Sequence, residues 1–250
     1  MSKVAIITGA SSGIGAASAL ELSKRGWSVV VNYSKSAAEA NAVAAQCTDA
    51  IVVAADVSED AECRKLAQAA LDRWDRIDAL VNNAGTTKFV KHEDLEGLSG
   101  DDILGIFRVN LVGPWQMIRA CAPSLKASRG SIVNISSVAS VLGTGSSVAY
   151  AASKAALETM SMSLARALAP EIRVNVVAPG FVKTAWQIAA NGQAGADELE
   201  QKYASVAPLR AAPQAEDVAE TVAWLLDGAR RITGDIIYVD GGMHIASPRR

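Results

Sequence analysis

Short apolar runs recur along the chain, and longer stretches of mixed apolar and polar residues separate them. Seven runs are almost wholly apolar and rich in β-branched residues: 4–8, 28–33, 51–55, 79–82, 131–136, 173–178 and 236–239. A run without apolar–polar alternation is typical of a strand buried on both faces of a parallel sheet. Helical patterns lie between the runs, for example at 13–25, 60–74, 103–127, 148–169 and 215–226. The pattern therefore predicts strands that alternate with helices.

This alternation favours one architecture. It predicts an α/β fold with a doubly wound, Rossmann-type parallel sheet of seven strands, helices on both faces and right-handed crossovers. No linker, repeat or low-complexity tract interrupts the pattern, so we expect a single domain over residues 1–250. The longest part between strand and helix patterns is 184–213, rich in Ala, Gly and Gln, and we expect a lid or substrate loop there.

Composition limits the classes of function. The 250 residues are 50% hydrophobic, and 24 Lys plus Arg against 26 Asp plus Glu give a net charge of -2. This balance argues against a nucleic-acid partner, and no run reaches the ~18 to 20 apolar residues of a membrane span. Three scattered cysteines (Cys47, Cys63 and Cys121) and two distant histidines argue against a metal site. The odd cysteine count suits a reducing compartment, so we expect a cytoplasmic protein.

A glycine-rich turn follows the first predicted strand and precedes a helix. Glycines permit a tight turn and a close backbone approach, and the first N–H groups of a helix suit a pyrophosphate. The spacing G-x-x-x-G-x-G differs from the commoner G-x-G-x-x-G, and no Gly-Lys-Ser/Thr follows, which argues against an ATPase-type phosphate loop. The residues that we expect to bind a dinucleotide here are Gly9, Ser11, Ser12, Gly13, Ile14 and Gly15.

The end of the second predicted strand bears on the choice of dinucleotide. NAD is usually held there by a carboxylate on its ribose hydroxyls, but this strand ends in Asn32, Tyr33, Ser34 and Lys35. Hydrogen-bond donors and a cation suit the 2′-phosphate of NADP, which a carboxylate would repel. We expect NADP to be preferred, with NAD possible. The alternative, that Lys35 is only a solvated residue before the next helix, stays open.

Three residues form a candidate proton-transfer site. Tyr150 and Lys154 are four residues apart in a helical pattern and therefore share one face. A tyrosine with an ordinary pKa near ~10 is a poor acid or base at neutral pH, but a nearby ammonium lowers that pKa. Ser137 ends a predicted strand, where open α/β sheets bind ligands, and its hydroxyl can bond a substrate oxygen. Each residue alone is equally compatible with an ordinary helix surface or turn.

In their order and spacing, these motifs resemble the classical short-chain dehydrogenase/reductase family over essentially the whole chain. The resemblance rests on Thr8-Gly9-x-x-x-Gly13-Ile14-Gly15, Asp56-Val57, Asn82-Asn83-Ala84-Gly85, Asn110, Ser137, Tyr150-x-x-x-Lys154 and Pro179-Gly180 followed by Thr184. It implies reversible NAD(P)-linked reduction of a ketone to a secondary alcohol, with the hydride chemistry supplied by the cofactor.

The resemblance also implies a role for each position. Tyr150 is the expected general acid and base, Ser137 orients the carbonyl, Lys154 lowers the pKa of the tyrosine and binds the nicotinamide ribose, and Asn110 anchors a relay water through its kinked helix. Asp56 is expected to bind the adenine amino group, although it could simply cap a turn. Further expected cofactor contacts are Val57, Asn83, Ala84, Gly85, Tyr150, Lys154, Pro179, Gly180, Val182 and Thr184.

The sequence predicts an N-terminal cap and a kink in the helix that carries Asn110. Ser99 and Asp102 have the spacing of an N-terminal capping box, and Gly113-Pro114 predicts a kink just after Asn110.

Within the family the chain is most similar to 3-oxoacyl-carrier-protein reductases and to sugar or alcohol dehydrogenases. Arginines typical of the former near the fifth and sixth strands are replaced by Ser131 and Pro170-Glu171, with Arg129 nearby, which weakens that interpretation. The glycine turn argues against a nucleotide-sugar epimerase. A non-catalytic NADP-binding sensor is the alternative from another class.

Two further expectations concern specificity and assembly. Trp186, Ile188 and Tyr203 could pack on a small carbonyl or alcohol substrate or could only seat the lid. The family commonly forms homotetramers. The small surface residues Ala152 and Ala156 and the segment 241–243 are compatible with such interfaces.

Overall fold

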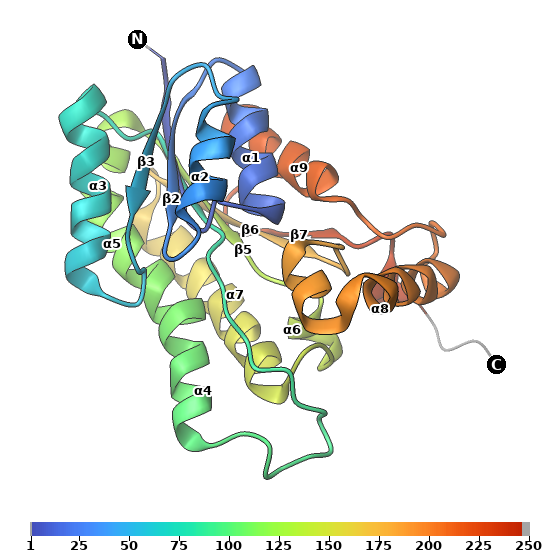
Figure 1. Cartoon of the computed structure of the whole chain (residues 1–250). Coiled ribbons are helices and arrows are strands. Elements are labelled where there is room, and N and C mark those ends of the chain that lie inside the picture. Colours follow the sequence, from blue (N-terminus) through green and yellow to red (C-terminus); the bar gives the residue numbers. More distant parts are fainter. Residues whose placement is uncertain (1, 247–250) are drawn as a thin grey trace.

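A computed structural model describes residues 2–246, which form a seven-stranded, fully parallel sheet (Figure 1). The strand order is β3-β2-β1-β4-β5-β6-β7. The strands are β1 (Val4–Ile7), β2 (Ser28–Tyr33), β3 (Ala50–Ala54), β4 (Ala79–Asn82), β5 (Ser131–Ile135), β6 (Arg173–Pro179) and β7 (Ile236–Val239). The predicted fold class is confirmed, and the predicted strands agree with these bounds to within one residue at each end.

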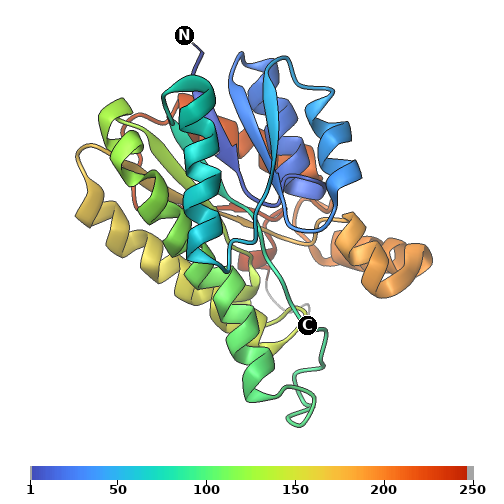
Figure 2. The ribbon, with the colours of Figure 1, turned by 60° about the vertical axis from the view of Figure 1, so that its left-hand side comes forward.

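Helices cover both faces of the sheet. One face carries α1 (Gly13–Lys24), α2 (Ala37–Ala44) and α9 (Ala215–Asp227), and the other carries α3 (Asp60–Trp74), α5 (Gly113–Ser128) and α7 (Val148–Leu168). Turning the molecule by 60° shows the two helical layers on either side of the strands (Figure 2). The remaining elements are α4 (Gly100–Phe107), the π-helical turn η1 (Arg108–Val112), α6 (Ala139–Leu142), α8 (Ala185–Val206) and the 3-10 turn η2 (Met243–Ile245).

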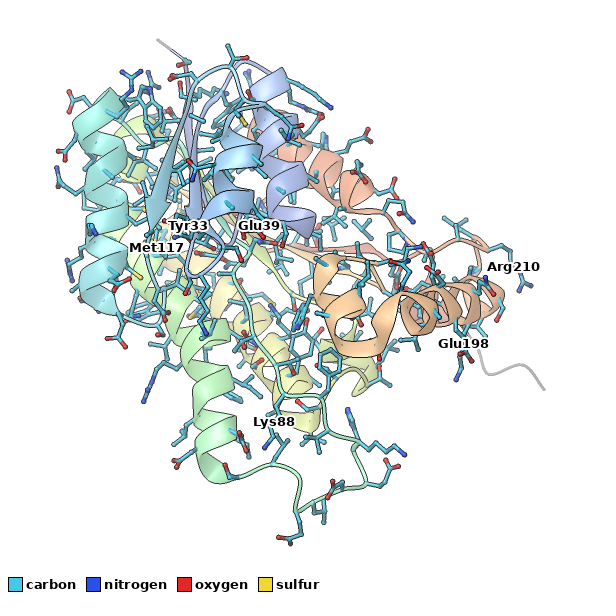
Figure 3. The ribbon with its side chains drawn as sticks, in the orientation of Figure 1. Tyr33, Glu39, Lys88, Met117, Glu198 and Arg210 are labelled. Carbon is cyan, nitrogen blue, oxygen red and sulfur yellow. The ribbon has the colours of Figure 1, made fainter. Side chains whose placement is uncertain are left out.

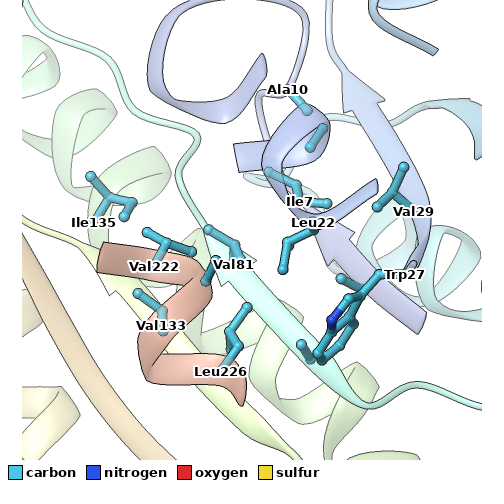
Figure 4. Packing of buried hydrophobic residues seen from close by; sticks show 14 of the residues in the cluster. Ile7, Ala10, Leu22, Trp27, Val29, Val81, Val133, Ile135, Val222 and Leu226 are labelled. Atoms are coloured by element: carbon cyan, nitrogen blue, oxygen red, sulfur yellow. The ribbon is translucent and has the colours of Figure 1, made fainter. Parts of the chain in front are cut away.

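Each strand sends alternate side chains into two separate cores. Ile7 of β1 packs with Leu22 of α1 and Val222 of α9 in the first core, where Trp27 closes one end (Figure 4). Its neighbour Ile6 lies in the second core, beneath α3, α5 and α7. Because both faces are dry, the strands read as continuous apolar runs in the sequence, which explains why their pattern could be recognised.

The order of the strands determines where a ligand can bind. From β1 the chain builds outward to β2 and β3 on one side, then returns to place β4 on the other side. The connections on the two sides therefore diverge, and they leave a crevice at the carboxyl ends of β1 and β4. The glycine turn after β1 and the Asn82–Gly85 turn after β4 both open into this crevice.

The expected kink after Asn110 is confirmed as the π-helical turn η1, directly between α4 and α5. Pro114 has no N–H group to donate to the carbonyl of Asn110, so a regular α-helix cannot continue there. At the start of α4, Ser99 and Asp102 form the predicted capping box. Lys88 of the preceding segment joins this cap through an ion pair with Asp102 at 2.7 Å, and Figure 3 shows Lys88 beside α4.

The expected substrate loop at 184–213 is helical over most of its length. Helix α8 has 22 residues and projects from the body of the molecule, with Glu198 on it and Arg210 just beyond (Figures 1 and 3). Gly192, with φ 70° and ψ 167°, breaks α8 into two parts. The alanines that made this stretch look like an insertion are strong helix formers, and that propensity outweighed the scattered glycines. Within residues 2–246, no helix is long and apolar enough to cross a membrane.

Candidate active site

A cleft of about 850 Å³ runs along the carboxyl ends of the strands. The glycine turn and the ends of β2 and β3 form one end, and Ser137, Tyr150 and the start of α8 form the other. Of the expected site residues, Gly15 and Asn110 do not line the cleft and support it from behind. The expected lining residues that the structure brings together are Gly9, Ser11, Ser12, Gly13, Ile14, Asn32, Tyr33, Ser34, Lys35, Asp56, Val57, Asn83, Ala84, Gly85, Ser137, Tyr150, Lys154, Pro179, Gly180, Val182 and Thr184.

Backbone geometry explains the glycines of the turn. Gly9 and Gly13 have φ of 61° and 55°, the left-handed region that L side chains rarely adopt. Gly15 is required by close packing, because a Cβ there would lie 2.5 Å from Nδ2 of Asn83. The turn is therefore a tight, bare backbone at the positive end of α1, and this geometry fits a dinucleotide pyrophosphate.

Thr8 and Asn83 lock this turn to the neighbouring strand end. The Thr8 hydroxyl accepts hydrogen bonds from the N–H groups of Asn83 and Ala84, both at 3.0 Å. In return, the Asn83 side chain donates to the carbonyls of Thr8 at 2.9 Å and Gly9 at 3.0 Å. Four hydrogen bonds thus join two turns that are far apart in sequence.

The structure gives Asn32 a different task from the expected contact with a 2′-phosphate. Its side chain is 1% exposed. Its Oδ1 accepts from Gly9 N at 3.1 Å, and Nδ2 lies 3.0 Å from the carbonyl oxygen of Ala55 and 3.2 Å from that of Val53. Backbone groups therefore engage both ends of the amide, and Asn32 holds the glycine turn against the ends of β2 and β3.

The neighbouring residues remain available to a ligand. Ser34 and Lys35 are exposed at the same end of the cleft, and Tyr33 is half-buried beside them. Asp56 caps a turn, since its Oδ1 accepts from the N–H of Ser58 at 2.9 Å, and the residue also lines the cleft.

Ser137, Tyr150 and Lys154 meet at the other end of the cleft. The Ser137 hydroxyl lies close enough to the phenol of Tyr150 to lower the pKa of the phenol. Lys154 is 4% exposed, its Nζ lies 5.7 Å from the centre of the Tyr150 ring, and it donates to the carbonyl of Ile135 at 2.8 Å. The serine at the end of β5 and the two residues one turn apart on α7 therefore occupy one site, as their spacing indicated.

Burial dominates the electrostatics of this pair. It raises the pKa of Tyr150 to about 12, opposed by the hydrogen bond with Ser137. It lowers the pKa of Lys154 to about 8, opposed by the charge of Glu158. The expectation that the ammonium lowers the tyrosine pKa is wrong for this site, because burial raises that pKa instead. At neutral pH the phenol therefore carries its proton, as a group that protonates a carbonyl oxygen must.

Asn110 lies behind the site on η1 and is fully buried. Its Oδ1 accepts from Thr86 N at 2.8 Å, while Nδ2 lies 3.0 Å from both the carbonyl of Thr86 and the hydroxyl of Ser153. A Cβ on Gly85 would lie 3.5 Å from Asn110 Oδ1 and 3.7 Å from Lys154 Nζ. The side chain thus joins η1 to the strand-end turn and to α7, next to the Lys154 ammonium.

The segment after β6 closes the cleft. Thr184 packs on the glycine turn, since a Cβ on Gly13 would lie 3.0 Å from its methyl group. Tyr203 of α8 donates to the carbonyl of Asp240 at 2.7 Å and covers Gly180. Tyr203 therefore seats α8 on the end of β7, while Ile188 does not line the cleft.

Trp186, at the start of α8, lines the cleft. Its ring meets the Tyr150 ring edge-to-face at 6.0 Å and the Phe89 ring at 6.3 Å. Phe89 comes from the extended segment after β4, so the two rims of the cleft meet in an aromatic wall above the phenol. We call Phe89 and Trp186 the aromatic wall. Phe89 was not among the predicted site residues, because it stands in an irregular segment without a motif.

Comparisons with known proteins agree with this site. A family model described as enoyl-(acyl carrier protein) reductase matches residues 9–244. A protein of Streptomyces violaceoruber, assigned as ketoacyl reductase 2 of the granaticin polyketide synthase, is 39% identical over 97% of this chain and 96% of its own length. The 3-oxoacyl-[acyl-carrier-protein] reductase of Staphylococcus aureus is 36% identical over 98% of this chain and 99% of its own.

Solved structures show the same likeness. A short-chain dehydrogenase/reductase from Burkholderia xenovorans superposes with a TM-score of 0.91 at 38% identity, covering 98% of this chain and 99% of that one. The ligand-free aldohexose dehydrogenase of Thermoplasma acidophilum gives 0.86 at 30% identity, covering 100% and 96%.

The chain belongs to the short-chain dehydrogenase/reductase family, whose members bind NAD(P). It is an oxidoreductase that interconverts a ketone and an alcohol. The bare glycine turn and the exposed Ser34 and Lys35 are compatible in shape and chemistry with such a cofactor.

Proposed function

We propose that this oxidoreductase reduces its ketone with NADP as the hydride carrier and Tyr150 as the proton donor. The observation that carries the proposal is the convergence of Ser137, Tyr150 and Lys154 in the cleft that also holds the glycine turn. The hydride for the carbonyl carbon would come from the bound cofactor. Ser137 holds the carbonyl oxygen by a hydrogen bond, and Tyr150 gives its phenolic proton to that oxygen as the C–O double bond becomes single.

Lys154 and Asn110 support this transfer. The Lys154 ammonium lies where it can bind the ribose of the cofactor and stabilise charge near the phenol. Asn110 keeps η1 in place, so that the helix backbone can anchor a water beside Lys154 for the return of a proton to Tyr150.

The test is Tyr150→Phe, which removes only the phenolic oxygen. Turnover should fall by at least about a hundredfold, the usual contribution of a general acid, while NADPH fluorescence still reports binding. Tyr238→Phe, on β7 outside the cleft, is the matched control and should keep full turnover. Undiminished turnover in Tyr150→Phe would overturn the mechanism, and NADPH binding without turnover on any carbonyl compound would favour a sensor.

The preference for NADP rests on the end of β2. Tyr33, Ser34 and Lys35 line the cleft there, and Lys35 presents an exposed cation where NAD-specific sites usually have a carboxylate. Lys35→Ala should lower kcat/KM for NADPH by about tenfold, as expected for the loss of a charge-assisted hydrogen bond, and leave that for NADH nearly unchanged. Equal losses with the two cofactors would contradict an NADP preference.

We propose a neutral 3-oxoacyl thioester, or a ketone resembling one, as the substrate. Among residues 2–246 the charged side chains that line the cleft are Lys35, Asp56 and Lys154, and the substrate end has none beyond Lys154. The apolar aromatic wall suits an acyl chain or ring next to the carbonyl. One relative is named as a ketoacyl reductase and another as a 3-oxoacyl-[acyl-carrier-protein] reductase.

A sugar or polyol is the second candidate, favoured by the polar residues Thr86, Ser146, Gln187 and Asn191 at the same end and by the aldohexose dehydrogenase neighbour. Initial rates with both cofactors on 3-oxoacyl thioesters, cyclic ketones, aldohexoses and enoyl thioesters separate the candidates. Activity on aldohexoses alone would overturn the thioester assignment, and activity on the enoyl double bond alone would overturn carbonyl reduction.

Assembly and location complete the proposal. We propose that residues 1–250 act as one cofactor-binding and catalytic domain in a cytoplasmic homotetramer. Exposed Trp115, Val112 and Met162, together with exposed Ala152 of α7, offer apolar surface for contact between subunits, and the three cysteines are free. A monomer in sedimentation at micromolar concentration would contradict the tetramer.

A further inference from the structure

A buried carboxylate lies one helical turn beyond Lys154. Glu158 of α7 is 6% exposed and does not line the cleft. Carboxylates are rarely buried without a partner, because removal from water disfavours the charged form. The motifs recognised in the sequence do not include Glu158, and nothing in the proposed reaction uses it directly.

The partners of Glu158 flank Ser137. The hydroxyls of Ser136 and Ser140 donate to the same oxygen, Oε1, at 2.7 and 2.6 Å. Ser140 Oγ also lies 2.7 Å from the carbonyl oxygen of Ser137. Since each hydroxyl has one proton, and bonds to a carboxylate are the stronger ones, both protons point to Glu158. A single carboxylate therefore holds the chain on both sides of Ser137.

These bonds join two elements that must stay in register. Ser137 follows β5, whereas Tyr150, Lys154 and Glu158 all belong to α7. Lys154 makes a second link, because its ammonium donates to the carbonyl of Ile135 at 2.8 Å. Ser136 Oγ also lies 3.3 Å from the carbonyl oxygen of Lys154. These links hold the chain next to Ser137 against the helix that carries the phenol of Tyr150.

The charge of Glu158 also faces the site. It opposes the effect of burial on Lys154, whose pKa is about 8. The other ionisable groups nearby are Tyr150 on α7 itself and Tyr238 and Asp240 at the end of β7. Burial and then Glu158 and Asp240 raise the pKa of Tyr238. The segment Ser136–Ser140 contributes only hydroxyl, methyl and backbone groups.

We infer that Glu158 is a positioning residue of the reduction: it fixes the segment around Ser137 against α7, the helix that carries Tyr150 and Lys154. The inference rests on the proposed function, because it assigns Glu158 a task in the reaction of Ser137, Tyr150 and Lys154. A purely structural role would affect folding alone, so kinetics separate the two roles.

The first variant is Glu158→Gln, which keeps the shape and one acceptor and removes the charge. We expect kcat to fall by about tenfold, as for a lost charged hydrogen bond, with KM and NADPH affinity within about twofold. The alkaline limb of the kcat–pH profile should move to lower pH, because Lys154 then loses its proton more easily. Glu220→Gln, an exposed residue of α9, is the matched control and should show neither change.

The second variant, Ser140→Ala, removes one link and keeps the charge. Here kcat should fall by about threefold to tenfold while the alkaline limb stays at its wild-type pH. If Glu158→Gln does not fold, Ser140→Ala decides, and wild-type kcat in that variant overturns the inference. Wild-type kcat and an unmoved pH profile in a folded Glu158→Gln overturn it as well.

Failure of the inference differs from failure of the proposed function. If Tyr150→Phe is inactive and Glu158→Gln is fully active, only the role of Glu158 is wrong. If Tyr150→Phe keeps turnover, the proposed chemistry itself is wrong, whatever the behaviour of Glu158→Gln.

Discussion

Replacing Asn32 by alanine tests the structure most directly, because two accounts of this residue predict opposite results. The sequence suggested a contact with the 2′-phosphate of NADP, which would affect one cofactor and leave stability alone. In the structure the amide is buried and binds backbone groups of the glycine turn and of the ends of β2 and β3. Asn32→Ala should therefore act on the fold of the turn.

The magnitude follows from the bonds that are lost. The alanine variant removes the acceptor for Gly9 N–H and the donor to the carbonyls of Val53 and Ala55. A net hydrogen bond is worth about 1 kcal/mol, and a partner left buried and unsatisfied costs about 1–3 kcal/mol. We expect the free energy of unfolding to fall by about 2–4 kcal/mol, a large effect for a single substitution.

Two measurements check this prediction. Urea unfolding gives the change in stability, and fluorescence titration gives Kd for NADPH and NADH, both of which should rise by similar factors as the turn loosens. Ser34→Ala, next to Asn32 but exposed, is the control and should keep full stability. Unchanged stability together with weakened binding of NADPH alone would refute the structural role and restore the phosphate contact.

Three further predictions concern the turn, the substrate and the pH dependence. Gly15→Ala should abolish binding of both cofactors in titration, since its Cβ would lie 2.5 Å from Asn83 Nδ2. The control Gly105→Ala, in α4, should bind both cofactors normally, because nothing lies within 4 Å of a Cβ there. Intact binding in Gly15→Ala would contradict this packing. Trp186→Ala should raise KM for aromatic and long-chain ketones about tenfold and change that for small ketones little, and a uniform change would refute contact with the substrate. Reductive kcat should be flat below about pH 8 and decline above it, because burial lowers the pKa of Lys154 to about 8; a rate that rises there would contradict the need for the ammonium.

The parts of the fold that the sequence predicted are those set by local pattern. Strands such as β2 and β4 were located to the residue, since burial on both faces leaves a continuous apolar run. The π-helical turn was also placed correctly, because Pro114 lacks the N–H group that a regular helix needs there. Helix α8 was missed, since most of its apolar residues are alanines, which carry no strong periodic signal.

The site shows the same division between local and distant contacts. Tyr150 and Lys154 could be paired from their spacing on one helix. The roles of Asn32 and Phe89 could not be predicted from spacing, because their partners Ala55 and Trp186 are brought near only by the fold. Glu158 was overlooked for the same reason: the serines that it binds lie 22 and 18 positions away in sequence.

Burial of Tyr150 and Lys154 also determines whether the empty site favours reduction or oxidation. It separates two groups whose ordinary pKa values are nearly equal, raising that of Tyr150 to about 12 and lowering that of Lys154 to about 8. At neutral pH the phenol of Tyr150 is therefore protonated, as reduction of a carbonyl requires. Oxidation of an alcohol must first remove that proton, and each unit of pKa above the pH makes the phenolate tenfold rarer, about 1.4 kcal/mol of free energy. The empty site thus favours reduction, and its oxidative rate should increase with pH until loss of the Lys154 proton intervenes.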